Sequence, residues 1–499
     1  MKNILRVKFI FLTFVLVVVA AASCQTPGTN SGNSGYENTT AGGQGDIIAE
    51  PATEDRFAIY KDEIDDYEYD FNGEEFKIQI FENVAVRNSI EAAEQTGDVF
   101  NDAMYKRNRT VEERFNVKIK EVAVGDFEND KTRKIIRAGD STAFDMFDAR
   151  CSDAFPNWTE NYAVSYDDIP VIDLKKPYWD ISANKTLTLA GNQWAAIGKF
   201  NFSTYDISHA LLFSKSLVND YALESPYNLV TSGKWTFDKM EEMMKQVITD
   251  LNGDGIMDNK DRYGYLTHPK QVLPNFWIAA GEFSIGKNEN DIPYLTMENE
   301  RFLTVFDRIY TMMWDTGAFY FEEAEQDIPI YAREMFAGKQ TLFMDTTLFL
   351  IESMRSMEMD FGIIPYPKFE ERQENYASRI EYYFVMQIPV TNGDLERAGV
   401  MLEALNSESA RTIYPAFFET ALKTKYARDD ESAEMLDLIT NSLIVDIGDT
   451  TLCYQIRDAL LSNMFAQNDR NLVSKIEKTE RSVIVPFIKN ISKKVDIAE

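Results

Sequence analysis

The sequence predicts an α/β fold built on parallel sheets and spread over more than one domain, and three observations support this. The chain has 499 residues, which at about 100 to 200 residues per domain corresponds to two or three domains. Hydrophobic residues make up 44% of it, with only 24 Gly and 15 Pro, so most of the chain can bury a core. Strand-like and helix-like segments alternate along its first part.

The first part of the globular body reads as strand, helix, strand, helix, strand. Phe76–Phe81 alternates as a strand, and Asp98 opens a helix whose apolar residues recur at helical spacing. Val117–Val122 is a second strand, a polar helix covers 128–138, and Phe144–Asp148 is a third strand. This order predicts a parallel sheet with right-handed crossovers.

Four later segments extend the same alternation. Thr236 is the predicted N-cap of a helix with a methionine-rich apolar face, which we expect to be core. Strands are predicted at 207–213 and Thr341–Met344, and a helix at Met435–Leu443. His209 lies in the first of these strands, and we expect a hydrogen-bonded interior histidine there instead of a ligand contact.

The N-terminus reads as an export signal. Lys2, Arg6 and Lys8 precede an apolar run, Phe9–Ala22, of about fourteen residues, which is shorter than the roughly twenty that span a bilayer. The run ends in Ala-Ala-Ser-Cys and resembles a bacterial lipobox, which predicts cleavage after residue 23 and lipidation, including palmitate, at Cys24. An ordinary cleavage site beside an incidental thiol is the alternative.

A flexible tether is predicted after the signal peptide. Residues 24–54 are rich in Ser, Gly, Thr, Asn and Gln and poor in large apolar residues, a composition typical of a solvated linker. We therefore expect the globular body to be held away from a membrane surface.

Charge and composition exclude several classes of partner and metal. The chain has 51 Lys plus Arg against 81 Asp plus Glu, a net charge of −30, which argues against nucleic acid. Two His and three Cys are too few for a zinc cluster, so any metal is expected to have oxygen ligands. Cys151 and Cys453 could pair in an exported protein, but the sequence does not show them within bonding reach; it favours two free thiols.

A loop after the methionine-rich helix has the spacing of a calcium loop. Oxygen donors stand at loop positions one, three, five, nine and twelve, the carbonyl of Ile256 at seven and Gly255 at six. Position twelve is Asp instead of Glu, and a strand follows instead of a helix. A structural calcium site is predicted, with a solvent-facing Asn-Gly-Asp-Gly turn as the alternative. The predicted ligands are Asp250, Asn252, Asp254, Ile256, Asp258 and Asp261.

Polar and aromatic residues follow the third predicted strand, where ligands bind in open α/β sheets. Asp148 and Arg150 are candidate ligand contacts, because an Arg there can grip a polar ligand bidentately; a surface Arg150 paired with Asp153 is the alternative. Trp158 is a candidate stacking platform for a sugar ring, with core packing as the alternative. Trp179 and Trp277 remain open candidates.

Several motifs in one order resemble a known family. Gly233–Asp238 with its helix, the Asn-Gly-Asp-Gly loop and Tyr263–Tyr265 resemble the extracellular solute-binding proteins of bacterial ABC importers, and most closely the carbohydrate-type branch (family 1). Further matching segments are Ile169-Pro170, Asp173-Leu174, Tyr178–Asp180, Ser225–Val230, Met335–Lys339 and Phe361–Pro367.

The resemblance implies a two-lobed, periplasmic-binding-protein-like α/β fold with multiple hinge crossings and a ligand cleft between the lobes. It places the first lobe at 55–204, the second at 205–383, and a return to the first lobe with C-terminal helices packing on both lobes at 384–499. Crossings are expected near 200–206 and 382–387. The ligand contacts it implies are Tyr205, Asp206, His268, Gln271, Asp345, Thr346, Tyr382 and Tyr383.

The expected function is capture of a small ligand, a mono- or oligosaccharide, by hinge closure and delivery to the transmembrane subunits of an ABC permease. The protein is expected to be a monomer, lipid-anchored outside the cytoplasm, and not an enzyme. Another importer solute such as a peptide, and a surface lipoprotein without a transport role, remain alternatives. A glycoside hydrolase would need a facing carboxylate pair that nothing marks, and no Gly-x-Ser-x-Gly elbow is present.

Overall fold

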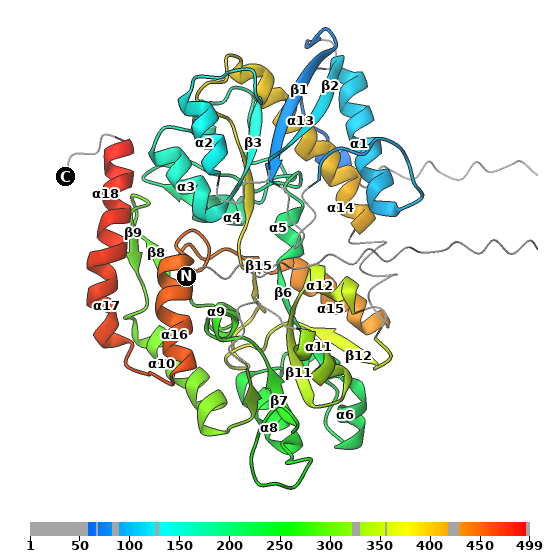
Figure 1. Cartoon of the computed structure of the whole chain (residues 1–499), viewed down its shortest axis with the longest axis vertical. Coiled ribbons are helices and arrows are strands. Elements are labelled where there is room, and N and C mark those ends of the chain that lie inside the picture. The colour runs from blue at the N-terminus through cyan, green and yellow to red at the C-terminus, as the bar shows by residue number, and fades with distance from the viewer. Residues whose placement is uncertain are drawn as a thin grey trace, which may run out of the picture. The chain divides into compact units, whose positions relative to one another are not determined.

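Figure 1 shows the computed structural model of the chain, which describes residues 58–65, 68–81, 89–124, 129–321, 330–354, 357–417 and 429–495. Every described helix and strand lies within residues 55–499. The predicted signal peptide, the lipidation site Cys24 and the tether up to residue 54 lie outside the described residues and stay predictions.

A parallel three-stranded core forms the first sheet, as predicted. Within the described ranges its order is β14-β3-β1-β2, in which β2 and β3 pair with β1 in parallel and β14 pairs with β3 antiparallel. Asp98 caps the first helix by accepting hydrogen bonds from the amides of Phe100 and Asn101. The strands are β1 Glu74–Phe81, β2 Val117–Val124, β3 Met146–Arg150 and β14 Phe384–Gln387; the helices that accompany them are α1 Val99–Phe115, α2 Asp130–Arg137, α3 Cys151–Thr159, α4 Ile181–Leu187, α13 Leu395–Arg411 and α14 Ile413–Pro415.

The second sheet has the order β10-β7-β11-β6-β12 within the described ranges, with β6 antiparallel to both of its neighbours. Its strands are β6 His209–Ser214, β7 Tyr263–Leu266, β10 Phe319–Tyr320, β11 Thr341–Thr347 and β12 Phe361–Ile364. Helices of this lobe are α6 Lys215–Asp220, α7 Pro226–Thr231, α8 Phe237–Val247, α9 Pro269–Ala279, α10 Glu300–Tyr310, α11 Ile330–Ala337, α12 Leu348–Ser353 and α15 Asp430–Asn441.

The remaining elements are short strands, short turns of helix and the C-terminal helices. α18 packs against α3 of the first lobe, and α16 packs against α9 of the second. The small strand pairs are β4 Thr188–Leu189 with β5 Asn192–Gln193, β8 Ile285–Lys287 with β9 Pro293–Leu295, and β13 Ser378–Arg379 with β15 Leu443–Ile444. The other helical segments are η1 Ala58–Tyr60, η2 Tyr166–Asp168, α5 Ser203–Asp206, η3 Thr311–Asp315, η5 Tyr454–Ser462, α16 Asn463–Ala466, α17 Val473–Thr479, η6 Glu480–Ile484 and α18 Val485–Lys494.

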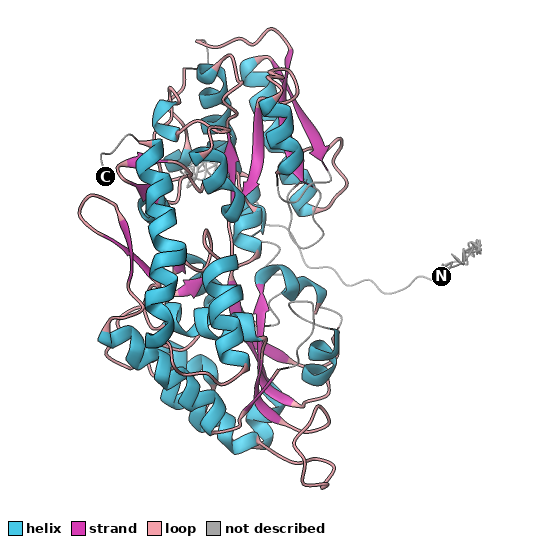
Figure 2. Ribbon diagram, turned by 60° about the vertical axis from the view of Figure 1, so that its left-hand side comes forward, coloured by secondary structure: helices cyan, strands magenta, loops and turns pink. Residues whose placement is uncertain are grey.

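Each sheet, with its own helices, forms one lobe of the body. Figure 2 shows the two sheets apart from each other, with the C-terminal helices running alongside both. The chain leaves the first lobe after α5, enters the second at β6 and returns through β14. The predicted fold class, a two-lobed α/β fold with more than one crossing between the lobes, is confirmed. In the part of the chain that the structure describes, no helix combines the length and apolar character needed to cross a bilayer.

The cores of the lobes are rich in aromatic residues and methionine. The methionine-rich face of α8 is buried as predicted: Met240 and Met244 are fully enclosed, and Thr236 caps the helix by accepting a hydrogen bond from the Lys239 amide. The helix lies so close to β7 that a Cβ added to Gly264 would stand 2.5 Å from the Cα of Met244. A side chain at residue 264 would therefore push α8 away from the sheet.

Candidate functional site

The two crossing segments lie side by side and are hydrogen-bonded at the junction of the lobes. Ser208, just before β6, forms an antiparallel bridge with Ile380, just after β13. The amide of Glu381 donates to the carbonyl of Ile207 at 3.2 Å. The hydroxyl of Thr204 accepts from the amide of Phe384 at 3.0 Å and donates to its carbonyl at 3.2 Å. The two crossing segments are therefore joined to each other by backbone and side-chain hydrogen bonds where the lobes meet.

A cation and two aromatic rings gather beside this junction, at the C-terminal end of β3. The guanidinium of Arg150 lies 4.5 Å from the ring centroid of Tyr382 and 5.6 Å from that of Tyr454. It donates a hydrogen bond to the Tyr454 hydroxyl at 3.0 Å. Arg150 is only 9% exposed, whereas Tyr454 is 45% exposed. The structure thus brings the predicted residues Arg150 and Tyr382 together; Arg150 is buried instead of lying at the surface, and Asp153 pairs with Arg133 at 2.8 Å.

Tyr454 is a member of this cluster that the sequence does not predict. It lies at the start of η5, more than 300 positions from Arg150 in the chain. Its neighbours in sequence form no recognisable ligand motif, so only the folded chain reveals it. Its half-exposed ring, held by a buried cation, is a surface on which the apolar face of a ligand ring can stack.

A buried polar network lies on the second-lobe side of the junction, and its centre is His209. Nδ1 of His209 is 3.0 Å from Oδ1 of Asp345, and Nε2 is 3.2 Å from Oε2 of Glu381. Asn275 donates to the same Asp345 oxygen at 3.1 Å and accepts from Arg379 at 3.1 Å. The ring of His209 is therefore an interior, hydrogen-bonded histidine, as predicted.

Two of the predicted ligand residues belong to this network. Gln271 accepts a hydrogen bond from Arg379 and donates to Oε1 of Glu381 at 3.2 Å. Asp345 is 3% exposed and also accepts from the Tyr366 hydroxyl at 2.5 Å. Both side chains therefore face protein groups in this structure, and they support the junction from within.

Ionic partners set the charge of this network. Burial and nearby Arg379 act to lower the pKa of His209, but Asp345 and Glu381 outweigh them and raise it above its ordinary 6.5. Burial acts to raise the pKa of Glu381, but His209, Arg457 and Arg379 hold it well below its usual range. The network therefore keeps the Glu381 carboxylate ionised beside cations beneath the junction.

The other predicted contacts are enclosed as well. Tyr205 is 1% exposed and its hydroxyl accepts from Lys199 at 2.9 Å, while Tyr383 bonds to Thr451 at 2.8 Å. Asp206 and Thr346 are fully buried. His268 is 8% exposed and caps α9 by accepting a hydrogen bond from the Lys270 amide at 3.2 Å.

Two of the residues predicted to contact the ligand near the third strand are buried. Asp148 is 1% exposed, and burial raises its pKa to about 8. Trp158 is fully buried; its indole N–H donates to Ser165 at 2.8 Å and its ring packs against Phe155 and Trp194. The stacking role predicted for Trp158 is not met in this structure, because α3 turns the ring into the core; Trp179 and Trp277 are buried too.

One pocket takes its lining from both lobes. It has a volume of about 430 Å³, with Asp180 and Ser182 at the start of α4 on one side and Tyr376 and the end of α15 on the other. Its rim is rich in hydroxyl and amide groups, including Asn375, Thr440, Asn441 and Ser442. These groups can exchange hydrogen bonds with the hydroxyls of a polar ligand.

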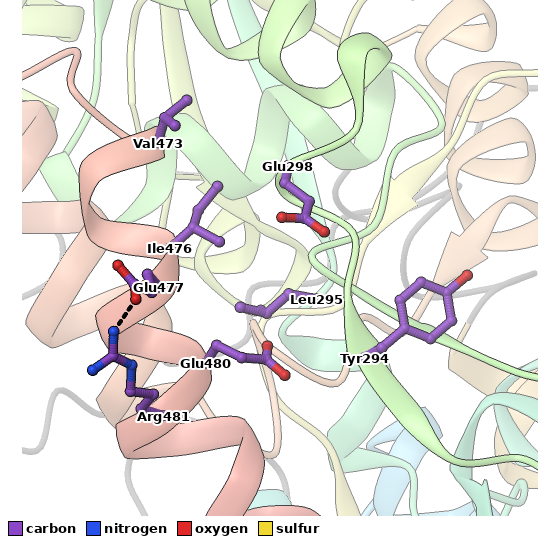
Figure 3. Close-up of a pocket in the computed structure, with 8 residues that line it drawn as sticks. All are labelled: Tyr294, Leu295, Glu298, Val473, Ile476, Glu477, Glu480 and Arg481. Carbon is purple, nitrogen blue, oxygen red and sulfur yellow. Dashed lines mark hydrogen bonds and ion pairs between the residues drawn. The ribbon is translucent and has the colours of Figure 1, made fainter.

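A larger pocket of about 520 Å³ lies away from the junction. Figure 3 shows it between the β8–β9 hairpin and the helical run of α17 and η6, with the Glu298 and Glu480 carboxylates near its wall and Glu477 paired with Arg481. None of the predicted site residues lines it. Its position on one side of the C-terminal helices separates it from the hinge.

The predicted calcium loop is closed by its own hydrogen bonds. The Asp250 carboxylate accepts from the amides of Gly253 and Gly255, and the fully buried Asp261 accepts from those of Leu251 at 2.9 Å and Asp258 at 2.8 Å. Among the residues that the structure describes, no group of three or more His, Cys, Asp or Glu side chains is gathered to hold a metal ion. Occupation by calcium would require these carboxylates to turn from the backbone toward the ion.

Comparison with known proteins identifies the fold. A scan of protein-family models finds no match to the sequence, and a search of curated proteins finds none either. Among solved structures, a cyclic α-maltosyl-1,6-maltose binding protein from Arthrobacter globiformis is similar at 12% identity and a TM-score of 0.56, over 83% of this chain and 99% of that one.

Two further solved structures agree. An extracellular solute-binding protein from Staphylococcus aureus in complex with maltose is similar at 14% identity and a TM-score of 0.54, over 84% of this chain and 98% of that one. UspC from M. tuberculosis is similar at 11% identity and a TM-score of 0.54, over 81% and 98%. The chain thus has the fold of ABC solute-binding proteins, and the resemblance inferred from its motifs is confirmed at the level of the fold.

Proposed function

We propose that this protein is an extracytoplasmic binding protein that captures a mono- or oligosaccharide between its lobes and delivers it to an ABC permease. The observation that carries the proposal is the Arg150–Tyr382–Tyr454 cluster at the junction of the two lobes. It presents an aromatic face and a cationic hydrogen-bond donor beside paired crossing segments. A sugar needs both, because its ring has an apolar face and its hydroxyls exchange hydrogen bonds.

The fold and its relatives support the same class of ligand. Solved structures with this fold include proteins in complex with maltose or maltotetraose and a cyclic α-maltosyl-1,6-maltose binding protein. Fold likeness alone does not carry function, so the ligand is argued from the cluster. The protein performs no chemical step in this proposal: closure of the lobes is a population shift driven by the ligand.

Anchoring by a lipid on Cys24 and a monomeric state complete the proposal. The export signal and the linker-like segment up to residue 54 support an anchored body. Release of an anchored protein into detergent, followed by mass measurement of the N-terminal peptide, tests the lipid; a peptide beginning before residue 24 would contradict it.

The sugar is tested by thermal melting against a panel of mono- and oligosaccharides, including maltose and maltotetraose. A ligand that binds only the native state at 100 times its Kd adds about 2.7 kcal/mol of stability and raises the melting temperature. We expect one saccharide class to raise it, with no breakdown of the sugar. Breakdown products would indicate a hydrolase, and a shift with peptides alone would replace the proposed ligand.

Two variants test whether the sugar binds at the Arg150–Tyr382–Tyr454 cluster. Tyr454→Ala removes the half-exposed ring, and we expect it to weaken sugar binding about 10- to 100-fold, as loss of an aromatic contact does at binding hot spots. Tyr294→Ala is the matched control, because Tyr294 is equally exposed, at 46%, but lines the pocket on the far side of the C-terminal helices. Equal effects of the two substitutions would place the sugar elsewhere.

Calcium binding by the loop 250–261 remains a proposal with its own test. Oxygen donors at alternate positions support it. If calcium binds, chelator should lower the melting temperature and calcium should restore it, and Asp254→Ala, at a residue exposed to solvent, should abolish the response. A melting temperature unaffected by chelator and calcium would leave the loop as a turn held by its own carboxylates.

A further inference from the structure

Two buried thiols meet at the junction of the lobes. Cys151 and Cys453 are both fully enclosed, and the amide of Cys453 donates a hydrogen bond to the carbonyl of Thr450 at 3.3 Å. The thiol of Cys151 also lies 3.2 Å from the carbonyl of Thr450. The two residues are unbonded in this structure, and they are about 300 positions apart in the sequence, so the contact is made only by the fold.

The two thiols belong to different lobes. Cys151 directly follows β3 of the first lobe and begins α3, and its amide donates to the carbonyl of Tyr383 in the return crossing at 2.9 Å. Cys453 directly precedes η5, which packs on α9 of the second lobe. A covalent bond between them would therefore join the end of the first sheet to a helix seated on the other lobe.

The surroundings of the pair favour its chemistry. The neighbouring Cys151 thiol lowers the pKa of Cys453, and the positive charges of Arg457 and Arg150 act in the same direction against the effect of burial. The thiolate is the nucleophile in thiol–disulfide exchange. Cys453 is the thiol of the pair whose surroundings favour the thiolate, and it attacks when local opening exposes its Sγ, which is enclosed in this structure.

We propose that Cys151 and Cys453 form a reversible disulfide in the exported protein and that this bond tethers the two lobes. The oxidant is an external disulfide. The Cys453 thiolate attacks one of its sulfurs, which forms a mixed disulfide and expels a thiolate; the Cys151 thiolate then attacks Sγ of Cys453 and expels the second. The two cysteines lose two electrons and two protons, and the oxidant becomes two thiols.

The bond itself is tested on the full exported chain without any substitution. The protein is incubated with oxidised glutathione, free thiols are alkylated in denaturant, and tryptic peptides are mapped. We expect peptides 151–175 and 429–457 to be joined, and to separate after reduction. Cys24 lies in neither peptide, so its modification does not affect the result. Recovery of both peptides singly alkylated, or glutathione retained on one of them, would overturn the proposal.

Thermal melting gives a second test of the tether. A disulfide that closes a loop of this length raises the melting temperature by about 5 °C, so we expect reductant to lower the wild-type value by that amount. Cys453→Ser is expected to melt at the reduced value with or without reductant, and Cys151→Ser to behave in the same way. A fall of the same size in the variants would show that reductant acts elsewhere.

Separation of the lobes is measured by small-angle scattering without ligand. The oxidised wild type should keep the smaller radius of gyration, and the reduced wild type and Cys453→Ser should share a larger one. This comparison does not depend on which solute the protein binds, so a failed sugar assay and a failed tether can be told apart. Equal radii in all three samples would overturn the tether.

Discussion

At the scale of single residues, His209 shows how a buried positive charge is stabilised by neighbouring carboxyl groups at the junction. Its ring is held between Asp345 and Glu381, and Arg379 and Asn275 complete the surroundings. The pKa of the ring is raised above its ordinary 6.5. A raised pKa in the folded state means that the stabilisation is fully present below about pH 6.5 and is lost as the pH rises through the folded value.

The first prediction follows from this dependence of stability on pH. His209→Gln should lower the free energy of unfolding by about 3 kcal/mol at pH 5.5, because it removes the cation held between Asp345 and Glu381. The loss should be smaller at pH 8.5, because the ring gives up its proton as the pH rises through its raised folded pKa. Denaturant unfolding at both pH values measures the difference. His268→Gln, at the other histidine of the chain, is the control, and the same pH dependence there would remove the assignment to His209.

The sequence predicts the burial of His209 but not its partners. An apolar strand pattern around a histidine is enough to indicate an interior position, and the structure confirms it. Asp345 and Glu381 lie 136 and 172 positions away in the chain. No local spacing brings such residues together, so the network can be recognised only after folding. Tyr454 and Arg150 are 304 positions apart, so this contact too can be recognised only after folding.

At the scale of elements, α8 and β7 are fitted to each other through Gly264. A Cβ at this position would meet both the Cβ and the Cα of Met244, at 2.2 and 2.5 Å. Gly264→Ala should therefore lower the free energy of unfolding by about 1–3 kcal/mol, the usual cost of overpacking. Gly393→Ala is the matched control, since nothing lies within 4 Å of its Cβ. Thermal melting of both variants measures the difference. Equal melting temperatures would show that α8 moves away from β7 without loss of stability.

A further prediction concerns the loop 173–179, which packs against α13. Glu403 of that helix is 2% exposed and accepts hydrogen bonds from the Asp173 amide at 2.9 Å, the Trp179 indole at 3.0 Å and the Tyr178 hydroxyl. Burial raises the pKa of this carboxyl to about 7, although the three donors act to lower it. Between pH 4.5 and 7 the folded state therefore binds more protons than the unfolded state.

Stability should accordingly fall as the pH rises through this window, by about 3 kcal/mol from Glu403 alone. Glu403→Gln, which cannot ionise, should flatten this dependence when unfolding is followed from pH 5 to pH 8. Glu396→Gln on the exposed side of the same helix should leave it in place. If the free energy of unfolding of Glu403→Gln still falls with pH as it does in the wild type, the pH dependence comes from other groups.

The elements themselves are predictable where local chemistry determines them. Asp98 and Thr236 cap helices as their sequence position indicates, and the β-branched alternation of 117–122 gives β2. Trp158 shows the limit. Its place after the third strand suggests a ligand surface, but strand β3 passes directly into α3, and helical periodicity then turns that ring inward.

At the scale of the whole molecule, the lobes and their crossings are predictable and the ligand surface is not. The order of motifs along the chain implies crossings near 200–206 and 382–387, and Ser208 and Ile380 pair beside those segments. The residues predicted as ligand contacts come from several loops whose spatial grouping no motif encodes. Of the predicted contacts, Arg150 and Tyr382 meet at the junction, whereas Gln271 and Asp345 act beneath it.

The last prediction tests the junction through Thr204, which is fully buried and holds both backbone groups of Phe384 with one hydroxyl. Thr204→Val keeps the shape but leaves the amide and carbonyl of Phe384 without that partner, at a cost of about 1–3 kcal/mol. The two crossing segments should then part more easily, so hydrogen exchange at the Phe384 amide should accelerate at least tenfold. Thr204→Ser should exchange as the wild type does. Unchanged protection of Phe384 in Thr204→Val would mean that Ser208, Ile380 and the network around His209 hold the lobes together without this hydroxyl.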